Sequence, residues 1–159
     1  MDMMDKQRFI FGSLFLLANK LQVIGDHYLG RDDITTKQWF LTVMLSQYGE
    51  NPPTLSEVAE LMGSSRQNVK QLALKLEEKE FLKIEKDEQD ARATRLKLTE
   101  KCRVFWEKRE GMDNEFIIDL FKDFSEEEID VVCGGFNKLF EKIKHLEKKH
   151  GRGISEYEK

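Results

Sequence analysis

Residues 54–99 read TLSEVAELMGSSRQNVKQLALKLEEKEFLKIEKDEQDARATRLKLT, and the spacing of apolar residues changes within this stretch. In residues 54–79 the apolar side chains recur every three or four positions on either side of Gly63, which predicts a helix, a tight turn and a second helix. From Phe81 to Leu98 they alternate with charged residues, which predicts two short strands. The polar segment from Asp87 to Thr94 is too long for a two-residue turn, so we expect it to project as a loop.

The second of these helices is expected to present a face without acids. Its apolar side chains Val69, Leu72, Ala73 and Leu76 share one side, and no Asp or Glu occurs from Ser64 to Lys75. Amides that pair with adenine edges, next to cations for guanine or phosphate, suit the major groove of DNA, although an ordinary solvated face has a similar composition. The candidate DNA-binding residues here are Ser65, Arg66, Gln67, Asn68, Lys70, Gln71 and Lys75, with Leu74 suited either to a thymine methyl or to packing.

The segment after these helices carries a more specific pattern. The string DEQDARATRLKLT, residues 87–99, resembles the wing signature of the MarR family, the multiple-antibiotic-resistance regulators: Asp-x-Arg-Ala, a short strand, then Leu-Thr. Residues 34–39 resemble the family's second-helix opening, and residues 55–62 and 65–82 resemble its helix-turn-helix. The resemblance covers about residues 8–148. It implies a mostly α fold with a small β-hairpin wing, a winged helix-turn-helix flanked by long N- and C-terminal dimerisation helices.

The resemblance also assigns roles in the wing. Arg92 would lie at the tip and enter a minor groove, where the concentrated negative potential attracts a guanidinium, and Asp90 would orient it through a charge-assisted hydrogen bond. Arg95 and Lys97 are expected to point outward from their strand and to serve phosphates. The alternative for Asp90 and Arg92 is a surface ion pair of little energetic value.

Two positions depart from the family pattern. Glu80 stands where the family usually has glycine after the recognition helix, and Cys102 stands where it has glycine after Leu-Thr. A non-glycine residue in a left-handed helix cap costs free energy, so we expect the turn at Glu80 to differ in shape. We expect Cys102 to pack as a small apolar residue.

Both ends of the chain carry the stripe of a long amphipathic helix. These stripes have more apolar surface than a 50-residue central unit could cover, which favours a homodimer and hence a pseudo-palindromic operator; an intramolecular bundle is the alternative. The stripes consist of Ile10, Leu14, Leu17, Leu21, Ile24 and Tyr28, and of Ile129, Val132, Phe136, Leu139, Ile143 and Leu146.

These patterns predict the organisation of the whole chain. Residues 1–34 would form the N-terminal dimerisation helix, and residues 35–99 the winged helix-turn-helix domain, with the helix-turn-helix at 54–79 and the wing at 81–99. Residues 100–150 would form the C-terminal dimerisation helices, and residues 151–159 a flexible tail. Capping-box spacing at Thr35/Gln38, Thr54/Glu57, Ser64/Gln67 and Ser125/Glu128 predicts helices beginning near 36, 55, 65 and 126, with another after Thr99.

Composition excludes several other classes. Cys102 and Cys133 form no CxxC pair and no histidine lies at metal-ligand spacing, so we expect no metal, no cofactor and two buried or half-buried thiols in a cytoplasmic protein. His27, His145 and His150 have no neighbouring nucleophile or paired carboxylate, which disfavours an enzyme. The apolar run from Phe9 to Ala18 is too short to span a bilayer and lacks a cleavage site, so we expect neither signal peptide nor membrane partner.

Charge is distributed unevenly. The net charge is −4, but residues 54–101 hold ten basic and ten acidic side chains, so the acidic excess lies elsewhere. We therefore expect a sequence-specific double-stranded DNA-binding transcription regulator. The resemblance implies a repressor that a small-molecule effector releases. Candidate residues for the effector pocket are Tyr28, Trp39 and Phe40, although such aromatics often belong to a core. The alternative is a winged-helix protein that no longer binds DNA and serves as a protein-interaction or ligand-sensing module.

Overall fold

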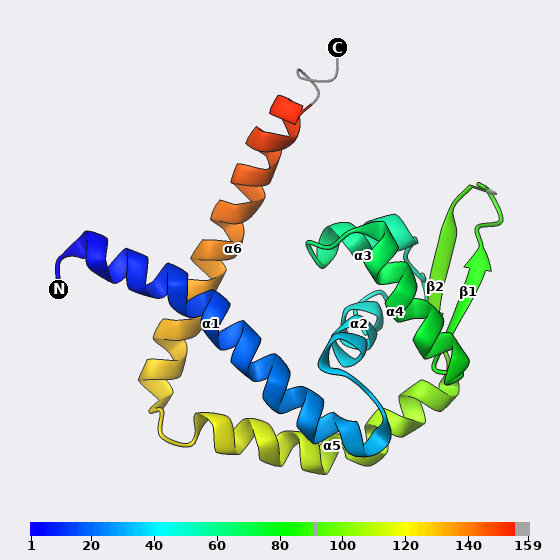
Figure 1. Cartoon of the computed structure of the whole chain (residues 1–159), viewed down its shortest axis with the longest axis horizontal. Helices are drawn as coiled ribbons and strands as arrows, with labels where there is room; N and C mark the ends of the chain where they lie inside the picture. The colour runs from blue at the N-terminus through cyan, green and yellow to red at the C-terminus, as the bar shows by residue number, and fades with distance from the viewer. Residues whose placement is uncertain (91, 155–159) are drawn as a thin grey trace. The chain divides into compact units, whose positions relative to one another are not determined.

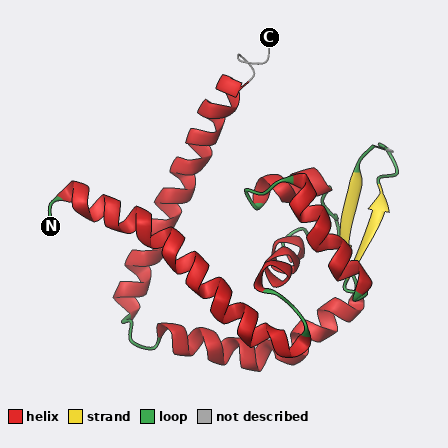
Figure 2. Cartoon of the chain, viewed as in Figure 1, coloured by secondary structure: helices red, strands yellow, loops and turns green. Residues whose placement is uncertain are grey.

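The computed structural model describes residues 1–90 and 92–154, and the chain divides into two units, residues 1–108 and 109–159. The first unit contains α1 (Met3–Leu29), the short 3-10 helix η1 (Gly30–Asp32), α2 (Thr36–Ser46), α3 (Leu55–Leu61), α4 (Arg66–Glu78), β1 (Leu82–Lys86) and β2 (Thr94–Leu98) (Figure 1). Helix α5 (Glu100–Phe121) begins in the first unit and continues into the second, which also contains α6 (Glu126–Ile154). A mostly α fold with one β-hairpin is confirmed (Figure 2).

Helix α4 is central to the first unit. It contacts α2, α3 and β1, and Figure 1 shows it between α3 and the hairpin. Apolar side chains of all these elements share one core, because each helix turns its three-to-four-spaced stripe inward. The most deeply buried members of the core are Leu41, Val58, Val69, Ala73, Leu76, Leu82, Leu96 and Cys102.

The hairpin is an antiparallel pair in which Leu82 lies opposite Leu98 and Ile84 opposite Leu96. This register places all four apolar side chains on the face that packs against the core, as the alternation predicts. The segment before α3 extends the sheet, because Thr54 forms an isolated antiparallel bridge with Arg95 and the Leu96 N–H donates to the Pro53 carbonyl at 2.9 Å. The wing is therefore joined by its backbone to the entrance of the helix-turn-helix.

The predicted helix starts at 36, 55 and 126 are confirmed, together with their capping boxes, and α5 begins directly after Thr99. The start predicted from Ser64 is wrong by one residue. Gly63 has φ +58°, and the Ser64 N–H donates to the Ala59 carbonyl at 2.9 Å, so Ser64 still belongs to the turn that ends α3. Ser65 is the N-cap of α4 instead.

Helix α1 corrects the length argument against a membrane span. It is 27 residues long, and by length and hydropathy it passes as a spanning helix. An N-terminal signal sequence and an apolar helix that packs on protein pass the same test, so this property alone assigns no membrane role. The C-terminal part of α1 packs on α2, where the Thr36 N–H donates to Asp26 Oδ1 at 2.7 Å.

Helix α6 is longer than expected. It continues to Ile154, so residues 151–154 of the predicted tail are helical, and residues 155–159 lie outside the described part of the chain. Between residues 126 and 149, where side chains are described, all but Ile129 are exposed. Cys133 is among the exposed residues, which corrects the expectation that both thiols are buried or half-buried.

Candidate nucleic-acid interface

The outer side of α4 matches the predicted DNA-binding face. Val69, Ala73 and Leu76 are buried and Leu72 is half-buried, which turns the opposite side of the helix to solvent. Leu74 is 37% exposed, so it is not committed to the core. The predicted residues of this face are all exposed: Ser65, Arg66, Gln67, Asn68, Lys70, Gln71 and Lys75.

Two serines order the start of this face. Ser65 Oγ accepts a hydrogen bond from the Asn68 backbone N–H at 3.1 Å, which satisfies one of the free amides at the helix N-terminus. Ser64 Oγ accepts a second hydrogen bond, from Asn68 Nδ2 at 2.8 Å. The Asn68 amide nitrogen is thereby held against the turn, and the residue as a whole stays exposed.

The wing loop is built by two aspartates. Asp87 Oδ1 accepts hydrogen bonds from the backbone N–H groups of Gln89 and Asp90, both at 2.8 Å. Asp90 Oδ1 in turn accepts from the Arg92 backbone N–H at 2.9 Å. The hydrogen bond expected between Asp90 and Arg92 is therefore made to the main chain. The Arg92 side chain is exposed, and among the described residues no ion pair to it is found.

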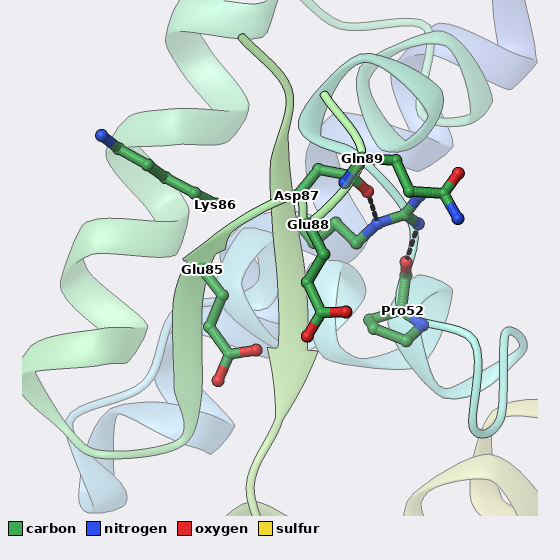
Figure 3. A pocket seen from close by; sticks show the side chains of 7 residues that line it. Pro52, Glu85, Lys86, Asp87, Glu88 and Gln89 are labelled. Carbon is green, nitrogen blue, oxygen red and sulfur yellow. Dashed lines mark hydrogen bonds and ion pairs between the residues drawn. The ribbon is translucent and has the colours of Figure 1, made fainter. Parts of the chain in front are cut away.

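Arg95 does not have the outward, free guanidinium that strand alternation led us to expect. Its Nε forms an ion pair with Asp87 Oδ2, and its Nη1 donates to the Pro52 carbonyl at 2.6 Å; Figure 3 shows both bonds. The Asp90 amide, then the Arg95 guanidinium and the Gln89 amide, hold the pKa of Asp87 below its usual value. The hollow around this group is lined by Pro52, Glu85, Lys86, Asp87, Glu88, Gln89 and Arg95.

Lys97 is exposed as predicted, and it has a neighbour that strand alternation alone did not single out. Lys83 lies directly opposite Lys97 in the hairpin register and is also exposed. Like charges placed opposite one another repel unless an anion lies between them, so this pair is suited to a phosphate.

Solved structures resemble this arrangement closely. The MarR/EmrR family transcriptional regulator from Acinetobacter sp. ADP1 is 22% identical, with a TM-score of 0.72 over 87% of this chain and 97% of that chain. MepR of S. aureus, solved as a DNA complex, is 22% identical, with a TM-score of 0.73 over 84% and 97%. FabT of Streptococcus pneumoniae, solved in complex with DNA, is 25% identical, with a TM-score of 0.62 over 88% and 99%. The chain has the MarR-family fold.

The similarity is carried by three-dimensional structure rather than by sequence. No family model matches the chain, and neither does any curated protein.

The MarR fold keeps its left-handed turn after α4 although Glu80 replaces glycine. Glu80 has φ +60°; its N–H donates to the Glu77 carbonyl at 2.8 Å, and the Phe81 N–H donates to the Leu76 carbonyl at 2.9 Å. These are the two bonds of a Schellman motif, so the expected change in turn shape is wrong. Thr99 Oγ1 donates to the Glu80 carbonyl at 2.6 Å and helps to hold the residue in place.

The other replaced glycine behaves as predicted. Cys102 is fully buried and packs in the core, which confirms its role as a small apolar residue. Burial raises the pKa of its thiol to about 11, so the thiol is protonated at neutral pH. Among the described residues no group of three or more His, Cys, Asp or Glu could hold a metal ion.

The three aromatics predicted for an effector pocket differ in burial. Tyr28 and Trp39 are half-buried and pack against the core, whereas Phe40 is 39% exposed. The rings of Trp39 and Phe40 lie 6.4 Å apart, centre to centre. These surroundings suit a core role for Tyr28 and Trp39. The effector pocket stays a prediction.

Sequence reasoning missed Asp87 and Pro52 as parts of this interface. Asp87 was assigned to the loop without a role, and Pro52 lies 43 positions before Arg95 along the chain. One local signal could have indicated the role of Asp87. Asp87 lies two residues before Gln89 and three before Asp90, and at this spacing an aspartate side chain can accept hydrogen bonds from both backbone amides.

Proposed function

We propose that the protein is a sequence-specific duplex-DNA-binding transcription regulator. The observation that carries the proposal is an exposed face of α4 that holds no acidic residue from Arg66 to Lys75, beside a hairpin whose loop displays Arg92. An α-helix fits the major groove, and a guanidinium is attracted to the narrow minor groove that adjoins it. One subunit could therefore contact two adjacent grooves.

The polar residues of the two elements have different expected tasks. Gln67, Asn68 and Gln71 have amides suited to adenine edges, so they would set sequence preference. The cations of α4, namely Arg66, Lys70 and Lys75, would contact guanine or phosphate, and Lys97 would contact phosphate with Lys83. Arg92 would occupy the minor groove.

We further propose that the protein acts as a homodimer. Described side chains on α6 are exposed almost throughout, including Phe136 and Ile143 of the predicted stripe, and α1 exposes Ile10 and Leu17. Apolar surface on this scale is unusual for a monomer and favours association. A two-fold axis would present two α4 helices to successive major grooves of a pseudo-palindromic operator.

Repression that a small molecule relieves is the regulatory mode we propose for the dimer. Phe40 is exposed beside the half-buried Trp39, which supports an aromatic contact surface for an apolar ligand. A regulator of this kind works in the cytoplasm, and DNA binding without a catalytic step requires no cofactor.

A second candidate function has one observation in its favour. Acidic side chains of Glu85, Asp87 and Glu88 line the hollow at the wing, and the chain has a net charge of −4. A wing surrounded by acids repels phosphates and is suited to a protein partner. This version of the protein would form dimers without salt-dependent binding to duplex DNA.

Titration of labelled duplexes with purified protein separates the two functions. The duplexes are first selected from the chromosomal DNA of the source organism by the unaltered protein. We expect Arg92→Ala to weaken binding by about 1–3 kcal/mol, and Gln67→Ala or Asn68→Ala to reduce the preference for the selected sequence over a scrambled one.

The matched control is Arg103→Ala on α5. Arg103 is an exposed arginine paired with Glu100 and Glu107, so its replacement removes the same charge away from both proposed contacts. Equal affinities of the Arg92→Ala variant and the unaltered protein would contradict the assignment of the wing.

A further inference from the structure

A continuous series of hydrogen bonds connects the segment before α3 to Arg92. The Pro52 carbonyl binds the Arg95 guanidinium, which forms an ion pair with Asp87. Asp87 binds the amides of Gln89 and Asp90, and Asp90 binds the amide of Arg92. Every residue of this series lies in the first unit of the chain.

The Asp87 carboxylate in the middle of the series is largely shielded from water, and Arg95 is only partly so. The Asp87 side chain is 8% exposed, although it lies at the base of a surface loop, and the Arg95 side chain is 40% exposed. A carboxylate that accepts hydrogen bonds from two amides and one guanidinium has little remaining capacity for other partners. Asp87 and Arg95 are therefore both engaged within the wing by hydrogen bonds, and Asp87 is nearly buried, in contrast to its neighbour Glu88, which is exposed.

Among the described residues, the main-chain bonds to the segment before α3 reach β2 but not the wing loop. These bonds join Pro53 and Thr54 to Leu96 and Arg95, close to the first residue of β2. Beyond this point the loop closes on itself, because the Asp87 N–H donates to the Ala93 carbonyl and the Ala93 N–H donates to the Asp90 carbonyl. The Arg95 side chain bridges the two regions.

We propose that Asp87 and Arg95 are positioning residues for Arg92. They hold the wing loop against the segment that leads into α3, so that Arg92 and the α4 face meet the duplex in a fixed geometry. This inference rests on the proposed function, and it replaces the direct phosphate contact expected for Arg95.

Charge and position make opposite predictions for Asp87. If only charge mattered, removal of an acid beside the DNA surface would strengthen binding. If Asp87 positions Arg92, the same change weakens binding. Asp87→Asn is suited to this test because the amide oxygen can still accept from Gln89 and Asp90, whereas the amide nitrogen cannot bind the Arg95 guanidinium.

The experiment measures binding of the full chain to a duplex that the unaltered protein has selected from a random-sequence library. We expect Asp87→Asn and Arg95→Gln each to weaken binding by about tenfold, and the double variant to be no weaker than either single one. Glu88→Gln is the matched control, with the same change in charge on the same loop, and it should bind as tightly as the unaltered protein or more so.

Two further readouts separate positioning from direct contact. A lost phosphate contact lowers the salt dependence of binding by about one unit, whereas Arg95→Gln should leave it unchanged. In an Arg92→Ala background, Asp87→Asn and Arg95→Gln should cause no further loss. An equal loss in that background, or tighter binding by Asp87→Asn, would overturn the proposal.

Solvent exchange of amide protons, followed by NMR without DNA, tests the geometric part alone. We expect the amides of Gln89, Asp90 and Arg92 to exchange several-fold faster in Arg95→Gln, while core amides of α4 exchange as before, which also shows that the variant is folded. Unchanged loop exchange would overturn the proposal. If the unaltered protein selects no duplex, the proposed function fails, and these exchange rates then decide whether the pair holds the loop.

Discussion

Glu80 shows at the level of a single residue how this fold accommodates an unfavourable backbone conformation. A left-handed conformation costs a residue with a Cβ roughly 1–2 kcal/mol relative to glycine. The turn is nevertheless held by the two Schellman bonds, by Thr99 and by an exposed ion pair between Glu80 and Lys101. An exposed ion pair contributes little, so the strain is not fully offset.

We therefore expect Glu80→Gly to raise the free energy of unfolding by about 1 kcal/mol. Urea denaturation followed by circular dichroism measures the change. Glu80→Ala is the control, because it removes the carboxylate and its ion pair but keeps the backbone strain. A gain in Glu80→Ala equal to that in Glu80→Gly would locate the cost in the side chain and contradict the explanation.

At the level of elements, Gly25 sets how closely α1 approaches α2. A Cβ at this position would overlap Thr36 Oγ1 and lie 3.2 Å from Thr36 Cγ2. The same hydroxyl donates to the Gln22 carbonyl at 3.0 Å, so Thr36 is not free to turn away. The end of α1 and the start of α2 thus pack through a contact that only glycine permits.

Gly25→Ala should lower the free energy of unfolding by about 1–3 kcal/mol, although alanine favours helix formation. Gly12→Ala on the same helix is the control. In the described part of the chain no atom beyond the neighbouring helix backbone lies within 4 Å of its added Cβ, and we expect a gain of about 0.5–1 kcal/mol. Thr36→Ala combined with Gly25→Ala should recover part of the loss. Thermal unfolding that shows both glycine variants to be stabilised would refute the close contact.

At the level of the whole molecule, the exposed stripes of α1 and α6 favour the proposed homodimer. Phe136 and Ile143 lie on the predicted stripe of α6, and both are close to half exposed. A second copy of the chain would bury these side chains without introducing a charge, and each apolar side chain buried in this way contributes roughly 1.5–3 kcal/mol. An isolated chain would leave them in water.

Phe136→Glu should therefore convert the protein to a monomer at micromolar concentration and abolish binding to a pseudo-palindromic duplex, since one subunit contacts only a half-site. Val131→Glu is the matched control, because Val131 is 74% exposed on the same helix but lies outside the stripe. Sedimentation velocity without detergent measures the mass. A monomeric unaltered protein would refute the dimer and favour an intramolecular role for the stripes.

Most of the fold could be predicted because its signals are local. The capping boxes of α2 and α3, the alternation in the hairpin and the absence of acids from Arg66 to Lys75 on α4 each depend on residues a few positions apart. The exposure of the candidate DNA-binding residues of α4 followed from periodicity alone, since a helix that buries Val69, Ala73 and Leu76 must expose the other side. The shift from Ser64 to Ser65 also has a local cause, the left-handed turn at Gly63, but its effect on the cap was underestimated.

The site details that could not be predicted depend on contacts between distant segments. Strand alternation points Arg95 outward, which predicted a phosphate contact. The residues around Arg95 give no sign of its actual partner, because the Pro52 carbonyl that accepts its hydrogen bond lies 43 positions away in the sequence. The strained turn at Glu80 is kept by Thr99, 19 positions later, for the same reason. Periodicity specifies which side of an element faces water, whereas the partner that a polar side chain finds there depends on how the folded elements are placed together.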